Sequence, residues 1–192
     1  MIAILKYNAG NTRSVENAIK RLGYDCIVTD DQEIILKAEK VIFPGVGEAS
    51  SAMQYLIEKG LDQTLKSLKQ PVLGICLGMQ LMCTDTEEGT TKGLGVFEST
   101  VRKFPPKDKV PHMGWNDFTV LKGQLFDRIE NTDHVYFVHS YYAGLSVDTI
   151  AICDYILPFS AGLQKDNFYA VQFHTEKSGK IGEQILKNFL EL

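Results

Sequence analysis

Apolar runs alternate with segments of helical spacing through the first half of the chain. Residues 2–7 predict a strand, and residues 12–22 predict an amphipathic helix because their apolar positions recur on one face. Asn11 is suited to cap the start of this helix, and Gly23 follows its end. Further strands are expected at 26–28, 40–43 and 71–73, with a helix over about 48–59 that Gly60 ends.

The second half has mostly strand-like apolar patterns with few helical ones between them. Strands are expected at 96–103, 117–121, 135–138, 150–155, 160–164 and 169–173. A helix after Ser178 closes the chain.

These patterns predict an α/β fold with a doubly wound, mostly parallel sheet flanked by helices. The second half should add an antiparallel or mixed strand region, because its strands follow one another without helical crossovers. We find no linker or repeat and expect one domain over residues 1–192.

A cysteine lies where the strand over 71–73 passes into a helix-compatible stretch. Gly74 and Gly78 flank Cys76 two residues away on each side, which is the layout of a nucleophile elbow with sulfur in place of a serine oxygen. The positive end of a helix N-terminus there would favour the thiolate. The alternative is a small buried cysteine on an ordinary turn, and Cys76 alone does not decide between them.

A base and an orienting carboxylate follow the last predicted strand. In extended backbone, residues two apart point to the same side, so Glu176 should reach His174 while the ring reaches a neighbouring strand end. Carboxyl ends of parallel strands meet at one rim of a sheet, which would bring Cys76 and His174 together. The alternative is a surface histidine–carboxylate pair.

A glycine-rich turn at residues 44–47 ends the strand over 40–43. Backbone N–H groups of Gly45 and Val46, with that of Leu77, could face an oxyanion. The alternative is a plain turn that starts a helix.

The composition is that of an ordinary soluble protein, with 44% hydrophobic and 23% charged residues. A net charge of −4 without a basic stripe argues against nucleic acid as a partner. No apolar stretch is long enough to span a membrane, and the start of the chain lacks a signal-peptide pattern. Four scattered cysteines suggest a cytoplasmic enzyme with free thiols. His112, His134 and His139 show no metal-ligand spacing, so we expect no metal and no cofactor.

Taken together, these motifs resemble the class I (triad) glutamine amidotransferases over nearly the whole chain. Residues 7–15, 111–116, 136–142 and 176–178 further resemble the glutaminase subunits of imidazole glycerol phosphate synthase. Thr175 departs from the proline usual between the histidine and the glutamate of the family, and we expect little effect on the chemistry.

The resemblance implies a catalytic triad of Cys76, His174 and Glu176 that hydrolyses L-glutamine to glutamate and ammonia through a glutamyl thioester. It implies oxyanion donors at Gly45, Val46 and Leu77. It also implies contacts to the amino-acid head of glutamine at Gly47, Gln80, Glu88, Ser140 and Tyr141, where a solvated loop charge is the alternative for Glu88.

The resemblance also implies a heterodimer with a (β/α)8-barrel cyclase that consumes the ammonia in histidine biosynthesis. Ammonia released into water becomes ammonium, which is not a nucleophile, so the glutaminase rim must face the barrel. Candidates for that face are Trp115, Asn116, Tyr136 and Lys177, with Asn11 beside them. In this family hydrolysis is weak until the cyclase binds its nucleotide ligand, and residues 45–47 are where we expect that coupling.

Three alternatives stay open at this point. One is the glutaminase of another synthase, such as that of pyridoxal phosphate, which should lack the segment over 111–116. Another is a non-enzymatic redox sensor with an elbow cysteine, which needs no histidine–glutamate pair. The third is an inactive protein kept only for partner binding, against which all three filled triad positions argue.

Overall fold

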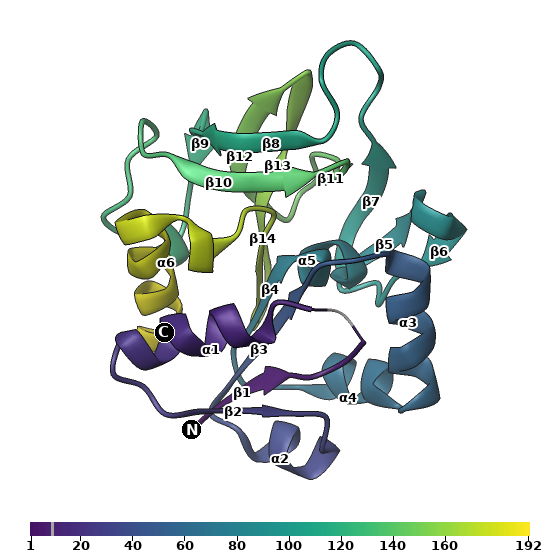
Figure 1. The fold of residues 1–192 in the computed structure, drawn as a ribbon, viewed down its shortest axis with the longest axis vertical. Helices are drawn as coiled ribbons and strands as arrows, with labels where there is room; N and C mark the ends of the chain where they lie inside the picture. Colours follow the sequence, from purple (N-terminus) through teal and green to yellow (C-terminus); the bar gives the residue numbers. More distant parts are fainter. Residues whose placement is uncertain (9) are drawn as a thin grey trace.

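The computed structural model describes residues 1–8 and 10–192; Ala9, within the segment 7–15, lies outside the described residues. The first half alternates strands and helices as its sequence pattern predicts (Figure 1). Its elements are β1 (Ile2–Leu5), α1 (Thr12–Arg21), β2 (Cys26–Thr29), α2 (Gln32–Lys37), β3 (Lys40–Gly45), α3 (Ala49–Glu58), α4 (Leu61–Ser67), β4 (Val72–Cys76) and α5 (Leu77–Met82).

The second half consists mainly of strands and closes with a helix. Its strands are β5 (Cys83–Thr86), β6 (Thr91–Lys92), β7 (Phe97–Lys103), β8 (His112–Asn116), β9 (Val120–Leu121), β10 (Val135–His139), β11 (Tyr141–Ala143), β12 (Thr149–Tyr155), β13 (Leu157–Lys165) and β14 (Phe168–Val171). The helical elements are the 3-10 turns η1 (Glu88–Thr90), η2 (Gln124–Phe126) and η3 (Thr175–Lys177), and the helix α6 (Gly179–Glu191).

The main sheet runs in the order β2-β1-β3-β4-β14-β13-β11-β7-β5-β6. The strands from β2 to β14 are parallel neighbours, and β13 pairs antiparallel with β14, which confirms the expected parallel sheet with a mixed region. The register sets Gly45 opposite Cys76 and Ile75 opposite Val171. The carboxyl ends of β3, β4 and β14 therefore lie side by side.

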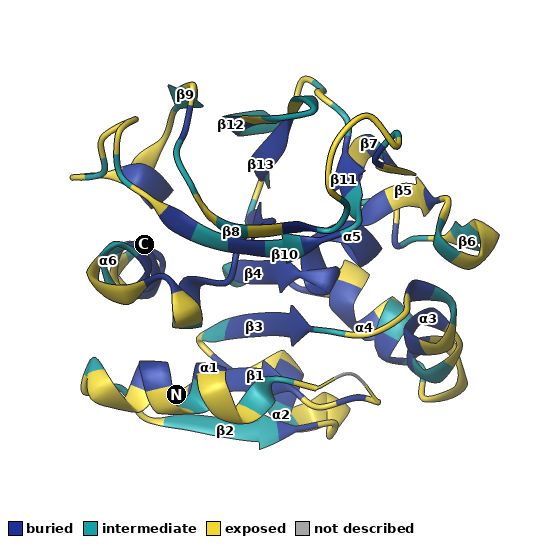
Figure 2. Ribbon diagram, turned by 45° about the horizontal axis from the view of Figure 1, so that its top comes forward, coloured by how far each residue is buried: buried dark blue, intermediate teal, exposed yellow. Residues whose placement is uncertain are grey.

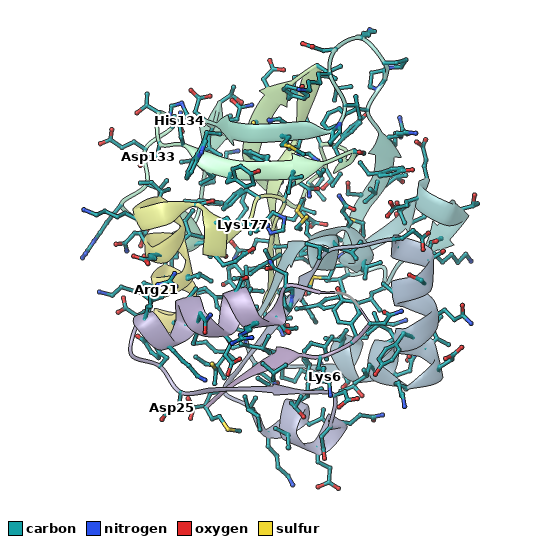
Figure 3. All side chains as sticks on the ribbon, viewed as in Figure 1. Lys6, Arg21, Asp25, Asp133, His134 and Lys177 are labelled. Carbon is teal, nitrogen blue, oxygen red and sulfur yellow. The ribbon has the colours of Figure 1, made fainter. Side chains whose placement is uncertain are left out.

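Two apolar cores cover the two faces of this sheet (Figure 2). Successive residues of β1 point to opposite faces, so Leu5 packs with α2, α3 and α4, while Ile4 packs with α1 and α6. An ion pair of 3.3 Å between Arg21 and Glu183 joins α1 to α6, which lie side by side (Figure 3).

A two-stranded antiparallel sheet, β8–β10, packs over the second core. Figure 1 shows it lying across the molecule beyond the ends of β4 and β14. We call this pair of strands the hairpin, although the connection between them is long and contains β9 and η2. Val135 and Phe137 of β10 are fully buried beneath it, so the hairpin is fixed to the fold through one face.

Several expectations from the sequence are wrong in detail. Asn11 precedes α1 with a φ of 79°, and its side chain makes no capping hydrogen bond. A strand was expected at 117–121, but the structure has β8 before it and only the short β9 at its end. The helices α2 and α4 were not predicted, because six and seven residues are too few to establish a helical period.

In the described part of the chain, no helix combines the length and the apolar character needed to span a membrane. The four cysteines, Cys26, Cys76, Cys83 and Cys153, are all free thiols.

Candidate active site

Cys76 lies at a strained turn between β4 and α5. Its φ of 54° and ψ of −107° are unfavourable for a residue with a side chain, and such strain is typical of functional sites. A Cβ on Gly78 would overlap the carbonyl oxygen of Phe43, and one on Gly74 would meet the sulfur of Met82 at 2.7 Å. The backbone of Phe43 thus leaves no room for a side chain at position 78, while at position 74 the side chain of Met82 would have to move. This is the geometry expected of a nucleophile elbow.

His174 and Glu176 form a buried hydrogen-bonded pair. Nδ1 of His174 lies 2.7 Å from Oε1 of Glu176, and both side chains are 0% exposed. The expected extended backbone is wrong here, because Thr175–Lys177 form the 3-10 turn η3. A tight turn, rather than strand alternation, brings the carboxylate back to the ring.

Ser178 fixes the backbone of this pair. Its hydroxyl donates to the carbonyl of His174 at 2.6 Å and accepts from the backbone N–H of Tyr136 at 2.9 Å. The backbone N–H of His174 donates in turn to the carbonyl of Tyr136 at 2.9 Å. The base is therefore tied to strand β10 of the hairpin.

The elbow and the base meet because β4 and β14 are parallel neighbours. Burial opposes a charge on His174, but its interactions with Cys76 and then with Glu176 outweigh burial and raise the pKa of His174 to about 10. For Glu176, burial alone would raise the pKa, yet the hydrogen bond to His174 holds it below its usual value.

Nε2 of His174 has no hydrogen-bond partner among the described residues. Cys76 is nevertheless close enough to raise the pKa of the ring, although no well-aligned hydrogen bond joins the two side chains. Catalytic hydrogen bonds commonly tighten only when substrate is bound. The arrangement fits a cysteine nucleophile beside an imidazole base whose second nitrogen is held by a carboxylate.

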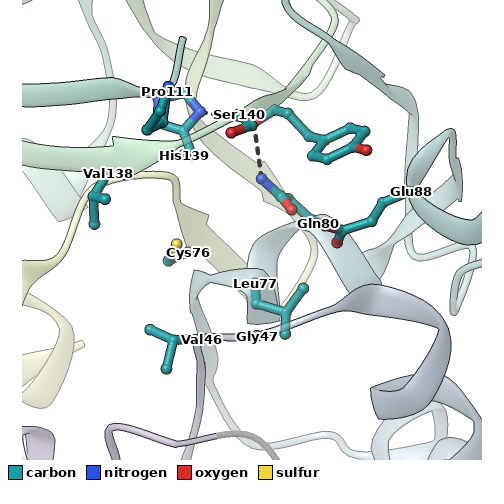
Figure 4. Close-up of a pocket in the computed structure, with 11 residues that line it drawn as sticks. Val46, Gly47, Cys76, Leu77, Gln80, Glu88, Pro111, Val138, His139 and Ser140 are labelled. Carbon is teal, nitrogen blue, oxygen red and sulfur yellow. Dashed lines mark hydrogen bonds between the residues drawn. The ribbon is translucent and has the colours of Figure 1, made fainter.

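A cavity of about 390 Å³ opens beside Cys76 (Figure 4). It brings together residues that are far apart in the sequence. The residues predicted to bind substrate line it: Gly47, Gln80, Glu88, Ser140 and Tyr141. Of the predicted oxyanion donors, Val46 and Leu77 also line it, while Gly45 lies opposite Cys76 in the strand register.

One carboxylate oxygen of Glu88 is already hydrogen-bonded within the protein. Its Oε2 accepts a hydrogen bond of 2.9 Å from the backbone N–H of Ala49. Burial raises the pKa of the Glu88 carboxyl, although this hydrogen bond acts against the shift. Glu88 lines the cavity, where a cation would relieve the burial of its charge.

Two residues near the nucleophile were not predicted. Gln172 is fully buried, donates to the sulfur of Cys76 at 3.7 Å and accepts from Gln80 at 2.9 Å. The hydroxyl of Tyr7 is buried without a partner among the described residues. Burial, followed by the charge of Cys76, raises the pKa of Tyr7 well above its ordinary value. A polar residue within the apolar run over 168–173 was a signal for Gln172, while Tyr7 was marked only as the start of the segment 7–15 that carries the family resemblance.

Asn11 proves to be close to the triad. Its side-chain amide donates to Oε1 of Glu176 and lies 3.5 Å from Nδ1 of His174. The residue that was expected to cap α1 and to face a partner therefore holds the carboxylate from the other side.

The other residues predicted to face a partner lie on or beside the hairpin. Trp115 is 56% exposed, and its ring lies 5.9 Å from that of its cross-strand neighbour Tyr136. Asn116 follows on β8 and is half-buried. Lys177 is exposed on η3, between the hairpin and α1 in Figure 3. We call Trp115, Asn116, Tyr136 and Lys177, which lie on the hairpin and on the turn that follows His174, the exposed rim.

Among residues 1–8 and 10–192, no cluster of three or more histidine, cysteine or acidic side chains is arranged to hold a metal ion.

Comparison with known proteins gives a consistent result over the full length. The profile of the family described as "Glutamine amidotransferase class-I" matches residues 3–192. The chain is 58% identical to "Imidazole glycerol phosphate synthase subunit HisH" of Bacteroides fragilis, covering 100% of this chain and 99% of that protein. It is 43% identical to the protein of the same name from Buchnera aphidicola, with the same coverage.

Solved structures share the fold at low sequence identity. A putative GMP synthase protein from Thermoplasma acidophilum superposes with a TM-score of 0.78 at 20% identity, covering 100% of this chain and 92% of that one. PurLQS from Thermotoga maritima superposes with a TM-score of 0.74 at 16% identity, covering 99% and 97%.

Proposed function

The chain belongs to the class-I glutamine amidotransferase family and is a glutaminase subunit of imidazole glycerol phosphate synthase in histidine biosynthesis; from this premise we propose that Cys76, His174 and Glu176 perform its chemistry. The sequence similarity favours this function over the glutaminase of another synthase and over a redox sensor. We propose that residues 1–192 act as one domain.

The observation that carries the proposal is the convergence of three parts at one rim. A strained elbow presents Cys76, and the parallel neighbour of its strand leads to a buried imidazole that a carboxylate holds. A nucleophile, a base and an orienting group in this order are what amide cleavage by a thiol requires.

The reaction follows from these groups. The sulfur of Cys76 attacks the side-chain amide carbon of glutamine while His174 takes the thiol proton. The tetrahedral oxyanion accepts hydrogen bonds from the backbone N–H groups of Gly45, Val46 and Leu77. When the C–N bond breaks, His174 gives its proton to the departing nitrogen, and ammonia leaves a glutamyl thioester on Cys76. Water then attacks the thioester, His174 takes a proton from it and returns a proton to the sulfur, and glutamate leaves.

The amino-acid head of glutamine fits the polar end of the cavity. We propose that Glu88 receives the α-ammonium group, since its charge is partly buried and only partly satisfied by the protein. Gly47, Gln80, Ser140 and Tyr141 complete the contacts from the cavity wall.

Cysteine substitution tests the reaction. Glutamate release is measured for the complex with the cyclase and its nucleotide ligand, for wild type, Cys76→Ala and Cys83→Ala. Cys83 is a suitable control because it is fully buried on β5 and lies outside the cavity. We expect Cys76→Ala to abolish glutamate release with the complex intact, and Cys83→Ala to retain it. Release by Cys76→Ala at the wild-type rate would exclude the mechanism.

We propose that the partner is a (β/α)8-barrel cyclase that binds the exposed rim and receives ammonia without its passing through water. Trp115 is a large exposed aromatic opposite Tyr136, whose backbone bonds to His174, and such a side chain has the character of an interface anchor. Both proteins would work in the cytoplasm.

Association is tested with two exposed apolar side chains. Trp115 is 56% exposed on the hairpin, and Ile57 is 60% exposed on α3, a helix that packs on the other core. We expect Trp115→Ala to weaken binding to the cyclase in titration calorimetry and Ile57→Ala to leave it unchanged. Equal affinities for both variants would place the interface elsewhere.

A further inference from the structure

Two buried histidines of the hairpin have no part in the proposed chemistry. His112 on β8 and His139 on β10 are cross-strand partners and are 3% and 6% exposed. Nδ1 of His112 lies 3.1 Å from Nε2 of His139. One of these two nitrogens must donate and the other must accept.

The direction of this hydrogen bond follows from the groups at its two ends. Nδ1 of His139 lies 2.7 Å from the carbonyl oxygen of Tyr141, which can only accept, so the hydrogen of His139 is on Nδ1. Nε2 of His139 then accepts from Nδ1 of His112, and Nε2 of His112 must itself accept. Its donor is the side-chain amide of Asn116 at 3.3 Å.

Asn116 is oriented independently. Its Oδ1 accepts from the backbone N–H of Asp117 at 2.9 Å, and its amide nitrogen also donates to the carbonyl of Asp154 at 3.1 Å. The amide cannot be turned around without losing both bonds. The series Asn116, His112, His139, Tyr141 therefore has a single direction, from the hairpin rim toward the cavity.

The cavity end of the series reaches the nucleophile. The carbonyl of Tyr141 also accepts from Nε2 of Gln80 at 2.9 Å, the bond dashed in Figure 4. The same nitrogen donates to Gln172 at 2.9 Å, and Gln172 donates to the sulfur of Cys76 at 3.7 Å. Each amide in this path has its orientation set by the group before it.

Aromatic rings hold the two imidazoles in place. His112 is stacked between Tyr155 at 4.0 Å and Phe137 at 4.7 Å, measured between ring centroids. Phe104 and Phe159 pack against His139, each at 5.3 Å. Burial lowers the pKa of His112 to about 4 and that of His139 to about 3, so both rings are neutral near pH 7. A protonated ring would set one N–H against another.

We propose that His112 and His139 are positioning residues. They form a hydrogen-bond relay that starts at Asn116 on the exposed rim and fixes the position of the Tyr141 carbonyl. Through that carbonyl the relay also fixes the side chains of Gln80 and Gln172. The proposal rests on the proposed function for the ligand in the cavity, which is glutamine. A shift of β8 would therefore move the Tyr141 carbonyl and Gln80, and with them the part of the cavity wall that contacts the substrate.

The relay has a spectroscopic signature that does not depend on turnover. Long-range nitrogen–proton correlation spectra of the complex should show both rings as neutral Nδ1–H tautomers at pH 7. His134, which is exposed, serves as the reference ring. An Nε2–H tautomer at His139, or a protonated ring at either position, would overturn the proposal.

Its effect on the site is measured as glutamine affinity in a Cys76→Ala complex and as KM and kcat with Cys76 present. His112→Phe keeps the stacking but removes the donor, and we expect it to weaken glutamine binding and raise KM roughly five- to tenfold, with kcat little changed. His112→Asn restores a donor near the position of Nδ1 and should recover most of the affinity. His134→Phe is the matched control and should change nothing.

Asn116→Asp provides a variant that leaves the core intact. A carboxylate beside Nε2 of His112 demands a donor there, which reverses the relay and turns the lone pair of His139 Nδ1 toward the Tyr141 carbonyl. We expect both tautomers to switch and glutamine affinity to fall. Unchanged affinity in folded His112→Phe and Asn116→Asp would overturn the proposal. If the tautomers are as derived but the wild-type complex releases no glutamate, the proposed function fails instead.

Discussion

Gly45 and Tyr7 fit against each other at the end of β3, and this contact allows a sharp test of packing. A Cβ added to Gly45 would overlap the hydroxyl oxygen of Tyr7, while the next nearest atoms, Cζ of Tyr7 and Cβ of Leu77, would lie 3.1 and 3.2 Å away. The obstacle to alanine at position 45 is thus a single oxygen. Gly45 is not among the residues with positive φ, so its backbone itself accepts alanine.

Each substitution at this contact has an expected effect on the free energy of unfolding. Overpacking of this kind costs about 1–3 kcal/mol, so Gly45→Ala should destabilise the chain by about 2 kcal/mol. Tyr7→Phe removes a hydroxyl that is buried without a partner among the described residues, and should raise stability by about 1 kcal/mol. In the double variant only the contacts at 3.1 and 3.2 Å remain. It should lie near wild type, since alanine also lowers the entropy of the unfolded chain by an amount worth about 0.4–1 kcal/mol.

Urea unfolding of the four proteins measures this double-mutant cycle. With a slope of about 2 kcal/mol per molar urea, Gly45→Ala should lower the midpoint by about 1 M and the double variant should recover it. An unchanged slope is the control that the unfolded state is the same. The reasoning is refuted if Gly45→Ala is as stable as wild type, or if Tyr7→Phe fails to rescue it.

Two further predictions concern the base. Because the pKa of His174 is raised in the folded state, its pairing stabilises the fold fully below about pH 6.5 and progressively less as the pH rises toward 10. Because the pKa of Glu176 is lowered, the stabilisation from its carboxylate is present above about pH 4.5 and is lost below that pH. The free energy of unfolding of wild type, minus that of His174→Gln, should therefore fall between pH 6.5 and 10, and a flat difference would contradict the assignment. Ser178→Ala removes a buried hydroxyl that bonds His174 and Tyr136, and should lower stability by about 1–3 kcal/mol in urea unfolding. If Ser178→Ala unfolds at the wild-type midpoint, these bonds do not hold the base.

The sequence predicted the parts of the fold that rest on local periodicity. Alternating strands and helices in the first half imply parallel neighbours, and from that follows the meeting of Cys76 with the end of β14. Gly74 and Gly78 on either side of Cys76 indicated an elbow in the sequence, because such a turn packs closely and favours glycine at these positions. The substrate-binding residues were predicted from the family resemblance rather than from periodicity, and all five line the cavity.

What the sequence left out depends on tertiary pairing. Strand β8 carries its apolar residues, Met113 and Trp115, on its exposed face, so no buried apolar face marks it in the sequence, and it exists through its pairing with β10. The extended path expected after His174 gave way to a turn, which the hydroxyl of Ser178 stabilises. Asn11 could be read as a cap from its position alone; only the fold brings it to Glu176.

The single turn that carries both His174 and Glu176 has a mechanical consequence. Ring and carboxylate are joined within three residues and fastened by Ser178 to the backbone of Tyr136, whereas the sulfur belongs to a separate strand. Small shifts of the hairpin would carry the two oxygens and the two ring nitrogens as one body. The gap between Nε2 and sulfur is then an adjustable length in the proton path, and a neighbour pressing on the exposed rim would change it while the bond between ring and carboxylate kept its length.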